Sequence, residues 1–187
     1  EVAGELKVEK NLNLSGALVQ EFRYATDTLL LIGDAVGIDE NGLAVKVNAD
    51  IPADSESYRP AIGIVAGFVE AEDGEQAPNI VKIAVGGSVK GFKDLQVGAR
   101  YYLADSAWQA RMIAENMNDQ STSTDVLLTS LMPQEPEYYG EMIQVMGIAK
   151  SANEILIMPS LDYRIVKHCL LYTSPSPRDL STSRMPS

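Results

Sequence analysis

The side chains that most often carry enzyme chemistry are nearly missing from this sequence. It contains one histidine, His168, and one cysteine, Cys169, and these two are adjacent. A Ser-His-Asp or Cys-His nucleophile needs an imidazole beside it, and the usual zinc sites need several His or Cys ligands. Chemistry would therefore have to use carboxylates, hydroxyls, lysines or arginines, and a carboxylate-pair hydrolase is the enzyme class that these residues still permit.

The acidic residues are numerous and dispersed, so the sequence nominates no catalytic pair. Oxygen ligands for calcium could come from Asp39, Glu40 and Asn41, or from the acidic run at 70–75 that contains Glu70, Glu72, Asp73 and Glu75. Adjacent acids in turns usually face solvent. No phosphate-binding glycine motif is present. We therefore expect no enzymatic activity, no catalytic residues, no metal site and no cofactor.

Aromatic side chains are the best candidates for recognition. Trp108, Tyr138 and Tyr139 could contact a carbohydrate or a protein, because exposed aromatic residues dominate recognition surfaces. Packing in the core or between subunits is the alternative for all three. Tyr101 and Tyr102 are consecutive on an expected strand, so one should be buried and the other should point outward.

Short strands with turn residues between them are predicted along most of the chain, which favours a barrel or a sandwich. Asn41 and Gly42 tolerate positive φ and predict a hairpin turn within 33–47. Gly86 and Gly87 are expected to end one strand before another resumes. The expected strands cover 61–69, 80–85, 88–92, 142–149 and 155–158. Residues 95–104 are expected to be a turn that leads into a strand, and 126–132 a short strand or a turn.

One short helix is expected, over residues 108–118. Ser106 lies near its predicted N-cap, and Trp108, Met112 and Glu115 would share one face because they are spaced by four and three residues. The expected fold class is thus all-β with at most one short helix.

The N-terminal region has a spacing of its own. Leu6, Leu12 and Leu18 lie six residues apart, within short apolar alternations broken by Asn, Ser and Gly. This period is typical of a β-helix or of intertwined strands, although a single hairpin explains it equally well. A leucine stripe of this kind needs a cover, so the three leucines are the predicted oligomer interface.

Several stretches resemble a β domain found in bacteriophage tail fibres, appendages and related virion proteins. They are GELKVEKNLNLSGALV at 4–19, GDAV at 33–36, PAIGIVA at 60–66, VGARYYLA at 97–104 and IQVMGIAKSANEILIMPS at 143–160. The resemblance implies a non-enzymatic structural protein that assembles as a homotrimer in the virion. Residues 106–140 are longer than in the familiar pattern, and this insertion could be a receptor-facing loop or a contact with a neighbouring subunit.

The last residues have a different character. CLLYTSPSPRD at 169–179, followed by SRMPS at 183–187, resembles a translated sequencing adapter of the transposase type. We therefore expect 167–187 to be a non-native tail, 24–166 to be the barrel or sandwich domain, and 1–23 to be the leucine-spaced segment. The chain itself is expected to be a fragment of a longer reading frame.

Charge limits the partners. The net charge is −11, and excluding residues 169–187, which carry +1, leaves −12. Such an acidic chain disfavours nucleic acid and anionic membrane surfaces, and no apolar stretch is long enough for membrane insertion. The expected partners are further copies of the chain, other virion proteins, and a glycan or protein of the host surface. A capsid decoration protein and a glycan-degrading fibre enzyme are the alternatives.

Overall fold

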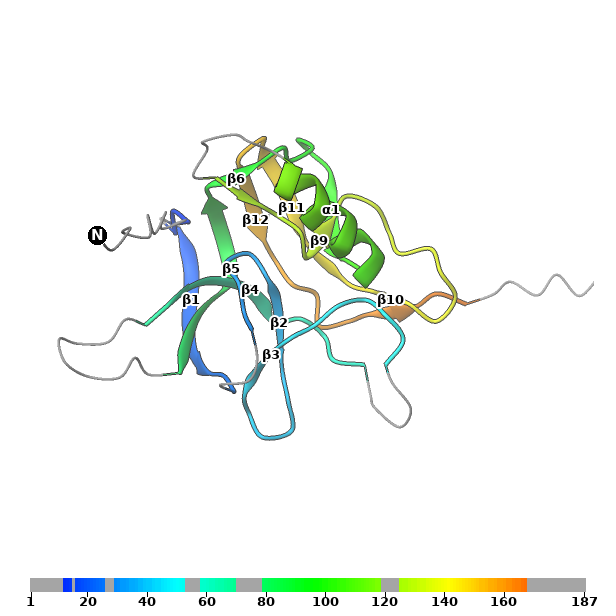
Figure 1. The fold of residues 1–187 in the computed structure, drawn as a ribbon, viewed down its shortest axis with the longest axis horizontal. Coiled ribbons are helices and arrows are strands. Elements are labelled where there is room, and N and C mark those ends of the chain that lie inside the picture. Colours follow the sequence, from blue (N-terminus) through cyan, green and yellow to red (C-terminus); the bar gives the residue numbers. More distant parts are fainter. Residues whose placement is uncertain are drawn as a thin grey trace, which may run out of the picture.

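In the part of the chain that the structure describes, nine strands form one sheet that curls into half a barrel, with a single helix beside it (Figure 1). The structure is a computed structural model and describes residues 12–14, 16–25, 29–52, 58–69, 79–118 and 125–167. This architecture confirms the expected all-β class with at most one short helix.

The elements follow one another as short strands, as the spacing of turn residues predicts. The strands of the sheet are β1 (Ala17–Arg23), β2 (Ala35–Ile38), β3 (Ala44–Lys46), β4 (Gly63–Phe68), β5 (Ile80–Lys90), β7 (Arg100–Leu103), β9 (Leu131–Met132), β11 (Val145–Ser151) and β12 (Glu154–Ile157). Two small pairs, β6 (Phe92–Lys93) with β8 (Val126–Leu127) and β10 (Met142–Ile143) with β13 (Arg164–Ile165), and the helix α1 (Ser106–Asn118) complete the fold.

Strand β5 organises the sheet. Its first half pairs with β4 and its second half with β12, while β1 runs along the opposite edge. The order from one end to the other is β3-β2-β4-β5-β12-β11-β7-β9. Because β4 and β12 share one edge of the same strand and then diverge, the sheet has to curl at the middle of β5.

Two glycines lie in the middle of β5, where the partner on one edge changes from β4 to β12. The expectation that Gly86 and Gly87 end the strand is wrong, because β5 continues through both of them. Gly87 has a φ of 88°, and a Cβ there would lie 2.2 Å from the carbonyl oxygen of Gly16 on the neighbouring segment. Only glycine accommodates both the left-handed backbone and this close approach, so Gly87 lets the strand continue past Gly16 with a local change of direction.

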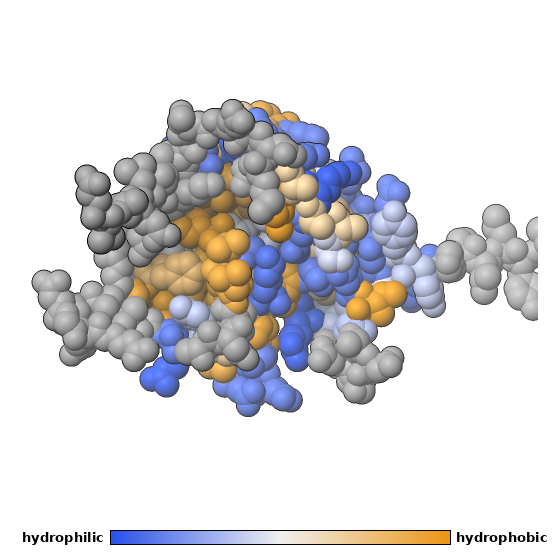
Figure 2. Space-filling model, in the orientation of Figure 1, coloured by the Kyte–Doolittle hydropathy of each residue, from blue (hydrophilic) through white to orange (hydrophobic). Residues whose placement is uncertain are grey.

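The sheet buries apolar side chains on both faces. The larger core contains Ile64, Phe92, Met146 and Ile155, and the smaller core contains Val65 and Ile83 among others. In Figure 2, apolar residues also reach the surface in the region of β1, β4 and β5. Several side chains that pack against the smaller core, including Phe22, Tyr24 and Phe68, are therefore only half-buried within one chain.

The burial of two tyrosines on β7 differs from the expectation. Tyr101 and Tyr102 do point to opposite faces of β7, but both are buried, with 4% and 8% of their surface exposed. The prediction that one of them faces outward is wrong. A strand between β9 and β11 has neighbours on both edges, and here side chains cover both faces as well.

Candidate functional site

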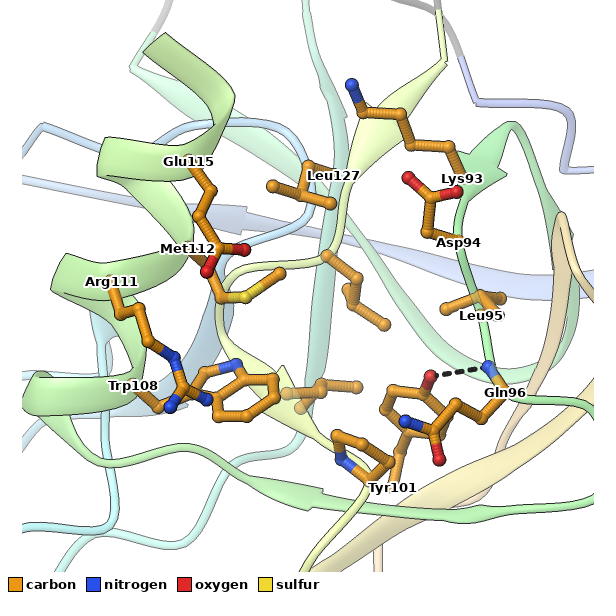
Figure 3. A pocket seen from close by; sticks show the side chains of 13 residues that line it. Lys93, Asp94, Leu95, Gln96, Tyr101, Trp108, Arg111, Met112, Glu115 and Leu127 are labelled. Atoms are coloured by element: carbon orange, nitrogen blue, oxygen red, sulfur yellow. Dashed lines mark hydrogen bonds between the residues drawn. The ribbon is translucent and has the colours of Figure 1, made fainter. Parts of the chain in front are cut away.

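A cavity of about 320 Å³ lies between helix α1 and the segment 93–96 (Figure 3). This is within the usual size range of small-molecule sites, about 300–1,000 Å³. One wall carries Trp108, Met112 and Glu115 of the helix, and the facing wall carries Asp94 and Gln96. Its floor is apolar and includes side chains of β8, of β9 and of the turn between them, namely Leu127, Leu128 and Leu131.

The helix presents one face to this cavity. Trp108, Met112 and Glu115 all line it, which confirms the predicted shared face. The helix begins two residues earlier than expected, at Ser106. Its N-cap is Asp105, whose carboxylate accepts a 2.6 Å hydrogen bond from the Trp108 backbone N–H, and Ser106 lies next to the N-cap, as predicted.

The facing wall is held in place by Tyr101. Its hydroxyl accepts a 3.0 Å hydrogen bond from the backbone N–H of Gln96, drawn in Figure 3. Burial raises the pKa of the Tyr101 hydroxyl, and the hydrogen bond from the Gln96 N–H acts in the opposite direction. Two residues before Gln96, Asp94 has a φ of 61°, the only positive φ of a non-glycine residue in the described chain.

The chemical character of the cavity is an apolar floor beneath a polar rim. Arg111 lies over the Trp108 ring, with its guanidinium carbon 4.4 Å from the ring centroid, a cation–π contact. The Trp108 Nε1 atom is buried and has no hydrogen-bond partner within the described residues. Lys93 and Arg111 supply two positive charges to the lining, and Asp94 and Glu115 supply two negative charges.

Sequence reasoning nominated Trp108 here, but it missed Asp94, Gln96 and Arg111. Nothing in the sequence marks them, because a polar loop and one face of a short helix look ordinary until the fold places them opposite each other. Tyr138 and Tyr139 are 71% and 60% exposed and do not line this cavity, so the three predicted recognition aromatics do not form one site.

The structure describes two of the three leucines of the predicted oligomer interface, and they differ in exposure. Leu12 is buried in the chain's own core with 8% of its surface exposed, whereas Leu18 on β1 is 61% exposed. The prediction that Leu12 and Leu18 form one exposed stripe is therefore wrong at Leu12. Leu6 lies outside the described residues, as does the tail from residue 168. The division into 1–23 and 24–166 stays a prediction, although β1 pairs with β5 of the main sheet.

The first acidic run closes a turn. The Asp39 carboxylate accepts hydrogen bonds from the backbone N–H groups of Leu43 and Asn41 at 2.7 and 2.9 Å. These bonds, the one from Leu43 above all, hold the pKa of Asp39 below its ordinary value. Within the described residues no group of three acidic, His or Cys side chains is arranged to hold a metal ion. The run at 70–75 lies outside them.

A third group of carboxylates surrounds Glu141, which is only 7% exposed. Burial raises the pKa of the Glu141 carboxyl, and the nearby charges of Asp105 and Asp50 raise it further. The hydrogen bond that it accepts from the Tyr138 backbone N–H, 2.9 Å long, acts in the opposite direction. Asp50 and Asp105 are themselves engaged with the start of α1, since they accept hydrogen bonds from Ser106 and Trp108.

We expect the substitution Glu141→Gln to stabilise the protein at neutral pH and to have little effect near pH 4. A carboxyl whose pKa is raised by folding contributes stability that is fully present below its unfolded pKa and is lost as the pH rises through the folded pKa. The amide keeps the acceptor for Tyr138 and carries no charge. Thermal unfolding of both proteins at about pH 4 and pH 7 measures the difference. Equal stabilisation at the two pH values would contradict the burial argument.

Comparison with known proteins returned no match: no family model, no curated protein and no solved structure is similar to this chain. No helix in the described residues is long and apolar enough to cross a membrane.

Proposed function

We propose that this chain is a non-enzymatic structural protein of a bacteriophage virion, a tail-fibre or appendage segment that assembles as a homotrimer and contributes to attachment at the host surface. The support from the sequence is the resemblance of its strand motifs to virion β domains. The support from the structure is the outer edge of β1, which is the observation that carries the proposal.

Strand β1 is an edge strand. It pairs with β5 along Ala17–Arg23, and among the described residues no strand pairs with its other edge over this range. Directly after the strand, Tyr24 forms an isolated parallel bridge with Ala44 of β3, so the open part of the edge is Ala17–Arg23. An unpaired edge offers backbone N–H and C=O groups to another chain. Leu18 is exposed on this strand, and half-buried apolar side chains reach the surface next to it in Figure 2. Further copies of the chain around a threefold axis would cover both features.

Self-association through β1 predicts that Leu18→Glu converts the trimer to smaller species. Burying a leucine contributes roughly 1.5–3 kcal/mol, and the substitution adds one negative charge to each chain, hence three to a trimer that is already acidic. Light scattering at physiological salt, where the Debye length is about 8 Å, measures the mass. Leu161→Glu is the matched control, because Leu161 is 72% exposed and lies between β12 and β13, neither of which pairs with β1. Leu12 is unsuitable, since replacing a core residue would unfold the chain.

Two outcomes would contradict this interface. A parent protein that is monomeric at micromolar concentration would exclude stable self-association. A trimer that is equally sensitive to Leu18→Glu and to Leu161→Glu, or to neither, would place the contact elsewhere, with the region 106–140 as the next candidate.

The non-enzymatic assignment is tested by the only carboxylate pair in the cavity lining, Asp94 and Glu115. A glycosidase needs one carboxylic acid kept protonated near neutral pH, usually by burial in an apolar site. Both of these side chains are exposed to solvent. We expect no release of reducing ends from bacterial polysaccharides. Turnover that is abolished by Asp94→Asn or Glu115→Gln would instead establish the glycan-degrading alternative.

A further inference from the structure

We propose that the cavity beneath α1 binds a neutral saccharide unit, held by hydrogen bonds to Trp108, Asp94 and Gln96. This deepens the attachment role proposed above and takes its biological meaning from it. The binding event itself is a property of one chain and is tested separately. The argument rests on an unpaired donor, on free polar groups along the rim, on a balance of charge and on one strained residue.

The unpaired donor is the indole N–H of Trp108. A buried N–H group without an acceptor costs about 1–3 kcal/mol, and native proteins rarely leave such groups unsatisfied. The Trp108 Nε1 atom has no acceptor among the described residues, and the residue lines the cavity. The atom itself has almost no surface open to solvent, so a ligand oxygen would satisfy it on a small turn of the indole toward the cavity.

The rim supplies polar groups that the protein does not use. No hydrogen bond or ion pair within the described chain engages the side chains of Asp94, Gln96 or Glu115. They come from both walls, with Glu115 on the helix and the other two facing it, as Figure 3 shows. Carboxylates and amides bind hydroxyl groups well, because a hydroxyl donates and accepts at once.

The charges and the apolar surface of the cavity lining indicate which class of ligand the cavity binds. The two positive and two negative side chains of the lining cancel, and the whole chain carries −11, so an anionic ligand would be repelled. The floor of leucines, together with Met112 and the aromatic rings of Trp108 and Tyr101, favours an apolar ligand face. A neutral sugar combines hydroxyls around its rim with C–H groups on the faces of its ring.

Asp94 carries the fourth observation. Its φ of 61° is in the left-handed region, which costs glycine nothing and which aspartate adopts more readily than most residues with a Cβ, at a small cost. Strained backbone of this kind concentrates at ligand-binding sites, where the side chain is needed in spite of its cost. If the Asp94 carboxylate serves a ligand, then glycine at this position should weaken binding without weakening the fold.

The experiment uses the single tryptophan of the sequence as its reporter. The intact chain is titrated with methyl glycosides of glucose, galactose, mannose and N-acetylglucosamine, up to the tens-of-millimolar range. Trp108 fluorescence reports occupancy of the cavity, and ligand-observed nuclear magnetic resonance gives an independent measure of binding. We expect at least one glycoside to produce a saturable fluorescence change.

Two variants separate binding from stability. Asp94→Gly should weaken binding of that glycoside at least tenfold while the melting temperature is unchanged or higher, because glycine relieves the strained φ. Asp94→Asn, which tolerates the same backbone and keeps a hydrogen-bonding group, should retain part of the affinity. Tyr138→Ala is the control, since it removes an exposed aromatic ring that does not line the cavity. Trp108→Phe, followed by nuclear magnetic resonance, should weaken binding by removing the N–H donor.

Absence of saturable binding by both methods would overturn the proposal. So would binding that Asp94→Gly and Trp108→Phe leave unchanged, or that Tyr138→Ala weakens equally. Failure here combined with a trimer that dissociates on Leu18→Glu would remove the saccharide site and leave the assembly role. Saccharide binding by a chain that is monomeric would support the saccharide site and remove the assembly role.

Discussion

Replacing Asp34 with alanine is expected to lower the free energy of unfolding by about 3 kcal/mol. The Asp34 side chain is 2% exposed and accepts hydrogen bonds from Lys46 at 2.8 Å, from the Leu31 backbone N–H at 2.9 Å and from the Ser130 hydroxyl at 3.1 Å. Removing one member of a buried ion pair usually costs about 3–5 kcal/mol. The lower end applies here, because Lys46 is 32% exposed and can turn toward water.

For a domain of this size a loss of 1 kcal/mol lowers the melting temperature by roughly 2–4 °C, so we expect a drop of about 6–12 °C by calorimetry. Asp162→Ala, which removes an exposed aspartate, is the matched control and should change little. A double substitution of Asp34 and Lys46 to Asn and Met tests the pairing, since it should cost less than the sum of its parts. A drop no larger than that of the control would show that Asp34 is dispensable.

The second large effect is expected at Gln144, a fully buried residue that ties three segments together. Its side-chain oxygen accepts from the Ala61 N–H at 2.7 Å, and its Nε2 donates to the carbonyls of Ala61 and Ser160 at 2.8 and 2.7 Å. The substitution Gln144→Leu keeps the side-chain volume but removes the amide, so the N–H and carbonyl of Ala61 and the carbonyl of Ser160 each lose their hydrogen-bond partner. Three backbone groups lose their partner at about 1–3 kcal/mol each, and one of them, the Ser160 carbonyl, is only partly buried, so the loss should be at least about 3 kcal/mol in urea unfolding.

The isosteric change Gln144→Glu gives a sharper test. A carboxylate would face two carbonyl oxygens, while its protonated form could still donate to one of them, so folding should raise the pKa of the introduced carboxyl. A raised pKa means that stability is present at low pH and lost as the pH rises. The variant should therefore approach the parent near pH 4 and fall furthest below it at pH 7. A loss of stability that is the same at both pH values would mean that the variant disturbs packing rather than hydrogen bonding.

The sequence determined the class of fold and most of the strand positions, because both depend on local signals. Alternating apolar residues, the turn at Asn41–Gly42 and the four-and-three spacing of Trp108, Met112 and Glu115 each act within a few neighbouring residues. The GDAV stretch was identified as a motif, and the structure supplies its reason, since its Asp34 side chain joins β2 to β3 and to Ser130, far along the chain.

Only the tertiary structure decided what depends on contacts between distant residues. Whether Gly86–Gly87 ends a strand or bends it depends on the close approach of Gly16, and whether Leu12 is exposed depends on which core lies beneath it. The cavity is the clearest case. Asp94 and Glu115 stand 21 positions apart in the sequence and carry no distinguishing pattern, and they line one site because the curl of the sheet and the docking of α1 place them on facing walls.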